Sequence, residues 1–100
     1  MRPIKRPSVI QELIGASENG RLRFSTHAQL RMKERNILIS DLEEAIFNSK
    51  REDAKDSLNT TGTDWKYALR GFNDDNTKDL RIIVTFVDPN IVVITVIDLN

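Results

Sequence analysis

The spacing of apolar and polar side chains changes several times along the chain. From Val9 to Ile14 the apolar residues recur with helical spacing, and Asn19-Gly20 is a typical helix end. Residues 21–25 then alternate between charged and apolar, which is typical of a strand. The first quarter of the chain is therefore expected to form a helix followed by a short strand.

Two more helices are predicted within residues 27–49. Thr26 and Ser40 each stand three residues before a glutamine or a glutamate, which is the spacing of a capping box. Asn36 is expected to end the first of these helices in a left-handed conformation. The apolar face of the second helix includes Phe47, which we therefore expect to face the core.

Three strands are predicted in the second half of the chain. Residues 65–70 alternate and place both of their aromatic side chains on one face. Residues 80–87 and 91–97 are apolar, β-branched runs, and Asp88-Pro89-Asn90 is a turn signature that joins them. The polar residues 50–64 that precede these strands are expected to form a mobile loop with an irregular edge strand.

The order of the elements predicts an α+β fold, in which a three- or four-stranded antiparallel sheet is packed by about three helices. A chain of 100 residues with 39% hydrophobic side chains has room for one core, so we expect a single domain over residues 8–100. Residues 1–7 are basic and rich in proline, and we expect them to form a flexible arm.

Charge and composition exclude several classes of function. Basic residues predominate in residues 1–36 and acidic residues in 37–64, so the surface is expected to be dipolar although the net charge is zero. The chain has no cysteine and a single histidine, which excludes thiolate catalysis and a cysteine- or histidine-based metal site. No cofactor is expected. No apolar run has the length of a signal peptide or a membrane span, so a cytoplasmic protein is expected.

The single histidine belongs to a strip of cationic side chains. His27, Arg31 and Arg35 follow one another at four-residue intervals, which places them on one face of a helix. Such a strip can contact phosphate, and it can equally be an ordinary solvated helix face. Both interpretations stay open at this point.

A second group of cations is predicted on the sheet. Lys66 and Arg70 share a strand face, Arg81 can lie beside them on the next strand, and Tyr67 can stack on a base. Metal-free RNA cleavage needs a base, an acid and cations for the developing charge, and lysine, arginine, tyrosine and histidine can supply these roles. The alternative is that these are surface charges that discourage aggregation, with Tyr67 in the core.

The segment from Phe24 to Ile46 resembles the bacterial family known as domain-of-unknown-function family 4258. The pattern that carries the resemblance is H-A-x-x-R-M-x-x-R, which is met by His27-Ala28, Arg31-Met32 and Arg35. The later Tyr67, Gly71 and the two terminal apolar strands also fit, so the resemblance covers about residues 21–97.

The layout of the whole chain is also similar to that of the MqsR-type toxins of toxin–antitoxin systems. That resemblance implies a RelE/barnase-like fold, metal-independent cleavage of messenger RNA and inhibition by an antitoxin partner. It places Lys55 at the first catalytic lysine of those toxins, Lys66 where they have glutamine and Arg81 where they have tyrosine. Their C-terminal lysine has no counterpart in this chain.

The sequence therefore predicts a toxin-like, metal-independent endoribonuclease with RNA and an antitoxin-like protein as partners. The competing prediction is a non-catalytic protein-interaction module of the same fold. The predicted catalytic residues are His27, Lys66 and Arg81, and the predicted RNA- or phosphate-binding residues are Arg31, Arg35, Lys55, Tyr67 and Arg70.

Overall fold

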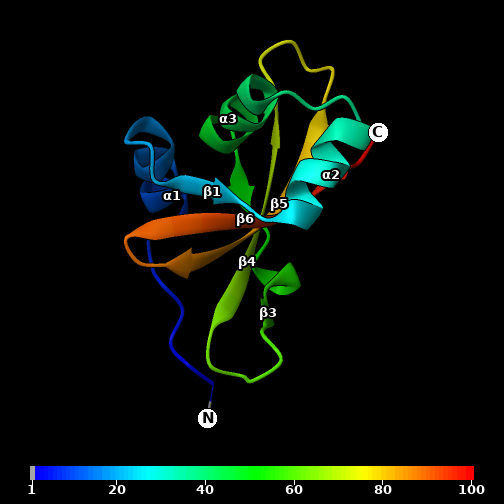
Figure 1. Cartoon of the computed structure of the whole chain (residues 1–100). Coiled ribbons are helices and arrows are strands. Elements are labelled where there is room, and N and C mark those ends of the chain that lie inside the picture. Colours follow the sequence, from blue (N-terminus) through cyan, green and yellow to red (C-terminus); the bar gives the residue numbers. More distant parts are fainter. Residues whose placement is uncertain (1) are drawn as a thin grey trace.

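The computed structural model describes residues 2–100 as an α+β fold (Figure 1). The helices are α1 (Val9–Glu18), α2 (Thr26–Glu34) and α3 (Ile39–Phe47), with a short 3₁₀ helix η1 (Asp53–Lys55). The strands are β1 (Leu22–Phe24), β2 (Lys50–Arg51), β3 (Ser57–Leu58), β4 (Trp65–Phe72), β5 (Asp79–Val87) and β6 (Asn90–Asp98). This order confirms the predicted succession of helix, short strand, two helices and three strands.

The sheet is larger than predicted and is mixed. Its strands follow the order β1-β6-β5-β4-β2, and β3 also pairs with β4. The antiparallel meander of β4, β5 and β6 is confirmed, whereas β1 runs parallel to β6. The prediction of a purely antiparallel sheet with three or four strands is therefore wrong. A three-residue strand carries no pattern that specifies its partner, and the polar segment before β4 gave no period-two signal.

One face of the sheet forms the core with the helices. Leu69, Ile82 and Val84 from β4 and β5 are fully buried in one cluster with Leu13 of α1 and Leu42 of α3. The opposite face, which we call the outer face, bears Lys66, Ala68 and Arg70 from β4 and their neighbours on β5 and β6. α3 packs on β4, and α2 packs beside β6. Buried residues of all three helices belong to the same core cluster.

Gly71 allows α3 to lie directly on β4. A Cβ atom at Gly71 would overlap the backbone carbonyl of Ala45 in α3. The approach of a helix backbone to a strand backbone at this point requires a residue without a side chain.

The helix ends differ by one or two residues from the prediction. Ser25, and not Thr26, caps α2, because its hydroxyl accepts a hydrogen bond of 3.0 Å from the Ala28 N–H. At α3 the Asp41 carboxylate accepts from the Leu38 N–H at 2.9 Å, so the predicted Ser40 cap is wrong. Asn36 does adopt the predicted left-handed conformation, with φ 54°.

Phe47 does not face the core as predicted. It is the last residue of α3 and is 72% exposed, while Leu42, Ala45 and Ile46 fill the apolar face. The three of them already cover the part of β4 that the helix reaches. Within residues 2–100, no helix is long and apolar enough to cross a membrane.

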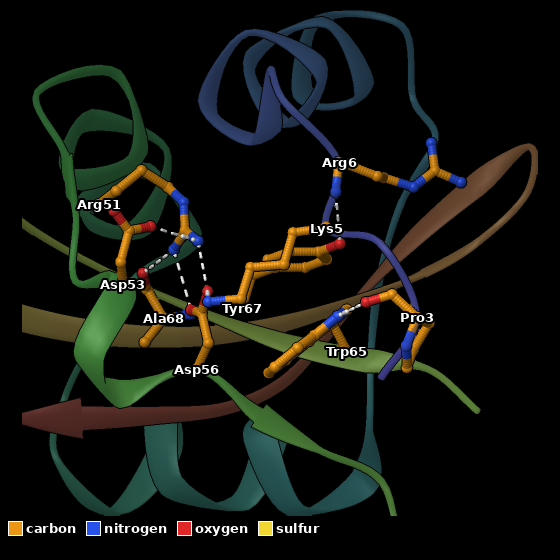
Figure 2. A network of polar contacts seen from close by, with 9 residues as sticks. All are labelled: Pro3, Lys5, Arg6, Arg51, Asp53, Asp56, Trp65, Tyr67 and Ala68. Carbon is orange, nitrogen blue, oxygen red and sulfur yellow. Dashed lines mark hydrogen bonds and ion pairs between the residues drawn. The ribbon is translucent and has the colours of Figure 1, made fainter. Parts of the chain in front are cut away.

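The basic N-terminal segment makes specific contacts with β4. The Trp65 indole nitrogen donates a hydrogen bond of 2.7 Å to the Pro3 carbonyl, and the Arg6 N–H donates one of 2.8 Å to the Tyr67 hydroxyl (Figure 2). Lys5 forms an ion pair with Asp56 at 2.9 Å. Buried tryptophan and tyrosine need partners for their polar atoms, and the segment that we expected to be a flexible arm supplies them.

Candidate functional site

A cavity of about 370 Å³ lies between α2 and the end of β6. Its walls are His27, Arg31 and Arg35 from α2 and residues 95–98 from β6. The four-residue spacing thus brings the imidazole and the two guanidiniums to one face of the helix, as predicted from the sequence. Figure 1 shows the C-terminal end of the chain beside α2.

Ser25 fixes the position of α2 beside β6. Its hydroxyl caps α2 and donates a hydrogen bond of 2.6 Å to the Ile94 carbonyl, and its N–H donates one of 3.0 Å to the Val93 carbonyl. The strand pairing of β1 with β6 ends at this point, where Phe24 lies opposite Val93. From there on α2 takes the place of a neighbouring strand, and the cavity lies between the helix and the edge of β6.

The side chains that α2 contributes to this cavity have almost no internal partners. Among residues 2–100, neither the His27 ring nor the Arg35 guanidinium makes a hydrogen bond or an ion pair with another side chain or backbone group. Arg31 has one ion pair of 3.7 Å with Glu34, in which both side chains are about half exposed. An exposed ion pair of this kind contributes little to the stability of the fold, so another anion can readily replace Glu34.

The cavity also contains residues that the sequence did not single out. Thr95 and Asp98 lie on its β6 side, and Asp98 is its one carboxylate. An aspartate at the end of a strand resembles an ordinary turn residue, so nothing in the sequence distinguished it. Only the placement of α2 beside β6 brings Asp98 to the helix cations.

The comparisons with known proteins identify a family. Residues 24–98 match the model of a family described as a domain of unknown function (DUF4258). The chain belongs to the DUF4258 family. This confirms the resemblance seen in the segment around His27, and the match includes every residue that lines the cavity. No curated protein and no solved structure matches the chain.

Arg70 and Arg81, two of the predicted sheet cations of this DUF4258 domain, lie together, and each is paired with a carboxylate. Arg70 and Arg81 stand directly opposite each other on β4 and β5. Two hydrogen bonds join Arg70 to Asp79, at 3.0 and 2.6 Å, and two join Arg81 to Glu52, at 2.6 and 3.1 Å. The Arg81 guanidinium holds the pKa of the Glu52 carboxyl below its ordinary value, and Arg70 does the same to the pKa of Asp79.

The ion-pair network reaches the border of the cavity. Arg81 lies opposite Ile97 of β6, which lines the cavity, so their side chains share the outer face. Because each guanidinium already holds a carboxylate in two hydrogen bonds, the outer face of the DUF4258 domain is an ordered network of alternating charge. The catalytic role of Arg81 and the phosphate contact of Arg70 stay predictions.

The remaining predicted residues do not line the cavity. Lys66 is half-buried on the outer face opposite Ser57, and Lys55 is exposed in η1. Their predicted roles are therefore not supported by proximity to His27. Tyr67 lies on the core face, where it is 4% exposed and its ring meets the Phe86 ring edge-on at 5.6 Å. The burial of the ring favours the alternative, in which Tyr67 belongs to the core, and its stacking on a base stays a prediction.

Asp56 is the centre of a second polar network, which the sequence did not predict (Figure 2). Its side chain has 0% exposure and accepts hydrogen bonds from Arg51 at 3.1 and 2.5 Å and from the Ala68 N–H at 2.8 Å, besides the ion pair with Lys5. This network holds the segment that we expected to be a mobile loop. Since Glu52 belongs to that segment, the network also fixes the partner of Arg81.

No metal centre is apparent in the part of the chain that the structure describes. Within residues 2–100, no group of three histidine, aspartate or glutamate side chains is placed to hold a metal ion.

Proposed function

We propose that this DUF4258 domain binds RNA at the cavity beside α2 and cleaves it without a metal ion, as a toxin-like endoribonuclease. The observation that carries the proposal is the convergence of His27, Arg31 and Arg35 on one cavity with almost no internal partner. An imidazole and two guanidiniums that share only one long ion pair, between Arg31 and Glu34, suit an anionic ligand. The phosphodiester group of RNA is one that presents both charge and several acceptor oxygens.

The contrast among the arginines of the chain supports this assignment. Arg51, Arg70 and Arg81 each hold a carboxylate in a hydrogen-bonded pair, and such pairs stabilise the fold. Arg35 is the one arginine within residues 2–100 whose side chain makes no hydrogen bond, ion pair or cation–π contact. A guanidinium that contributes nothing to the fold is available for a ligand.

The proposed chemistry follows from the side chains of the cavity. In metal-free cleavage the 2′-hydroxyl attacks the adjacent phosphorus, and the negative charge on the phosphoryl oxygens increases in the transition state. We propose that Arg31 and Arg35, which line the cavity, stabilise that charge and that His27 transfers a proton. In this proposal Arg81, which lies opposite Ile97 on the outer face at the border of the cavity, adds its positive charge to that of Arg31 and Arg35.

The fold is part of the proposal. An antiparallel meander packed by helices is the arrangement implied by the likeness to RelE/barnase-like toxins, and β4, β5 and β6 form such a meander. We propose the same fold class here, with an antitoxin-like protein as the partner that controls the activity.

The test is a cleavage assay on RNA of mixed sequence in excess EDTA. The wild-type chain should leave fragments that end in 2′,3′-cyclic phosphates, and His27→Ala and Arg35→Ala should lose this activity at an unchanged melting temperature. Lys33→Ala is the matched control, because Lys33 is an exposed cation of α2 that does not line the cavity. No cleavage by the wild-type chain, alone or with ribosomes, would overturn the proposal.

A second candidate function is a non-catalytic protein-interaction module. Leu38 and Ile39 are 65% and 57% exposed beside an apolar groove of about 560 Å³ that is lined by Phe24, Met32 and Ile37. Exposed apolar surface of this kind is typical of contact sites between proteins. A module that only binds protein would show no affinity for RNA at low salt, which separates it from the first candidate.

A further inference from the structure

Asp98 stands on a rigid part of the cavity wall. It is the last residue of β6 and lies opposite Leu80 of β5. The Leu99 N–H donates to the Asp79 carbonyl at 2.8 Å, which fixes the chain directly after Asp98. The Asn100 N–H donates to Asp98 Oδ1 at 3.0 Å, and within residues 2–100 the second carboxylate oxygen has no partner.

The chemistry proposed for the cavity needs two groups that transfer protons. One must remove the proton of the attacking 2′-hydroxyl, and another must protonate the leaving 5′-oxygen in the same turnover. The chain has one histidine, so His27 can fill only one of these places. Asp98 is the one carboxylate that lines the cavity together with His27.

We infer that Asp98 is the general base and His27 the general acid of the cavity. The inference rests on the proposed RNA cleavage and adds a residue to it. Asp98 takes the proton of the 2′-hydroxyl while the 2′-oxygen forms a bond to phosphorus. The bond from phosphorus to the 5′-oxygen breaks, and that oxygen takes a proton from the His27 imidazolium. The products are a 2′,3′-cyclic phosphate and a free 5′-hydroxyl.

The assignment of the two roles follows from the chemistry of the two groups. A carboxylate can accept a proton but has none to give, whereas an imidazolium can donate one, so Asp98 is assigned to the base and His27 to the acid. The charged groups near the pair are Arg31 and Arg35 from α2, with Glu34 ion-paired to Arg31. Arg81 lies opposite Ile97 at the border of the cavity, and the Lys78 ammonium donates to the Arg35 carbonyl at 3.0 Å. The cations offset the repulsion between the carboxylate and the phosphate.

The first arm of the test compares Asp98→Asn and His27→Gln with the wild-type chain on the same oligoribonucleotide in EDTA. Each variant should cleave about 10²–10⁴ times more slowly, which is the usual contribution of one proton-transfer group. The amide of Asp98→Asn keeps an oxygen for the Asn100 N–H, so the melting temperature should stay the same. Asp88→Asn is the matched control, because Asp88 is 73% exposed at the opposite end of β6 and should leave the rate unchanged.

The second arm uses an oligonucleotide in which sulfur replaces the bridging 5′-oxygen at one position. A thiolate leaves without a proton, so this substrate needs the base but no acid. His27→Gln should recover most of its rate on the sulfur substrate, whereas Asp98→Asn should stay slow. Recovery by Asp98→Asn, or a normal rate of that variant on ordinary RNA, would overturn the inference.

The two proposals can fail separately. Cleavage by the wild-type chain with an unaffected Asp98→Asn variant overturns the role of Asp98 and leaves the endoribonuclease in place. No cleavage of either substrate by the wild-type chain overturns both. Binding of a 2′-O-methyl oligonucleotide by Asp98→Asn with wild-type affinity should accompany the loss of rate, because this analogue binds without reacting.

Discussion

The Trp65 indole nitrogen donates a hydrogen bond of 2.7 Å to the Pro3 carbonyl and so joins β4 to the N-terminal segment. The Lys5 ammonium lies 4.5 Å from the centre of the same ring, and the Arg2 guanidinium lies 5.9 Å from it. Trp65 is the single tryptophan of the chain, and it is 9% exposed. Its fluorescence therefore reports directly on whether the N-terminal segment is in place.

Removal of residues 2–7 should shift the Trp65 emission to longer wavelength and make it more accessible to acrylamide. The physical reason is that the ring loses its hydrogen bond to Pro3 and the cations above it, and water takes their place. The far-ultraviolet circular dichroism should stay the same, because the removed residues contain no helix or strand. An emission spectrum identical to that of the full chain would contradict the docking of this segment.

Acid should destabilise the chain through Asp56. Burial raises the pKa of the Asp56 carboxyl, but the hydrogen bonds from Arg51, Ala68 and Lys5 outweigh this and leave the pKa below its ordinary value of 3.8. A carboxyl with a lowered pKa contributes stability that is fully present above the ordinary value and is lost as the pH falls through the folded-state value. The free energy of unfolding should therefore fall when the pH is lowered from about 4 toward the lower folded-state pKa.

Asp56→Asn tests this contribution by urea unfolding at several pH values. The substitution should cost about 3–5 kcal/mol at neutral pH, because it leaves Arg51 and Lys5 without their buried counter-charge. It should also reduce the fall in the free energy of unfolding that accompanies acidification. Asp53→Asn removes a 76% exposed partner of Arg51 and should cost less than about 1 kcal/mol. Equal effects of the two substitutions would contradict a central role for Asp56.

The sequence predicts the features of this fold that depend on neighbours in the chain. The cationic strip of α2 follows from four-residue spacing, and the turn at Asn36 follows from the residue type. The hairpin of β5 and β6 likewise follows from two apolar runs and a proline turn. In each case the decisive residues lie within a few positions of one another, so their geometry is set by the backbone alone.

The features that the sequence could not predict depend on pairs of residues that are far apart along the chain. The partner of Arg81 is Glu52, which is 29 residues away, and the partner of Tyr67 is the N–H of Arg6, which is 61 residues away. A free arginine and a paired one look the same in a sequence, so the sequence predicts site roles for both, a catalytic one for Arg81 and a phosphate contact for Arg35. Asp98 was missed for the same reason, since the parallel pairing of β1 brings α2 to it.

Gly71→Ala should destabilise the chain by about 1–3 kcal/mol or more. A methyl group at this position overlaps the Ala45 carbonyl, so α3 must move away from β4. Gly15→Ala is the matched control, because Gly15 lies within α1 and the nearest atom to its added Cβ would be 3.8 Å away. That substitution should raise stability by about 0.5–1 kcal/mol, since alanine favours helix over glycine. Thermal unfolding of both variants checks the pair, and a neutral Gly71→Ala would contradict the close packing.

Arg35→Ala and Arg81→Ala should differ in their effect on the stability of the fold. Arg81→Ala leaves Glu52 without a partner in a site where both side chains are about one-fifth exposed, so it should cost about 1–3 kcal/mol of stability. Arg35→Ala removes no contact within the described chain and should leave the melting temperature unchanged. In binding to a single-stranded 2′-O-methyl RNA, Arg35→Ala should reduce the dependence of log affinity on log salt by about 0.7, the contribution of one phosphate contact. Loss of stability in Arg35→Ala with an unaltered salt dependence would show that Arg35 stabilises the fold. The main argument for phosphate binding in the cavity beside α2 would then be wrong.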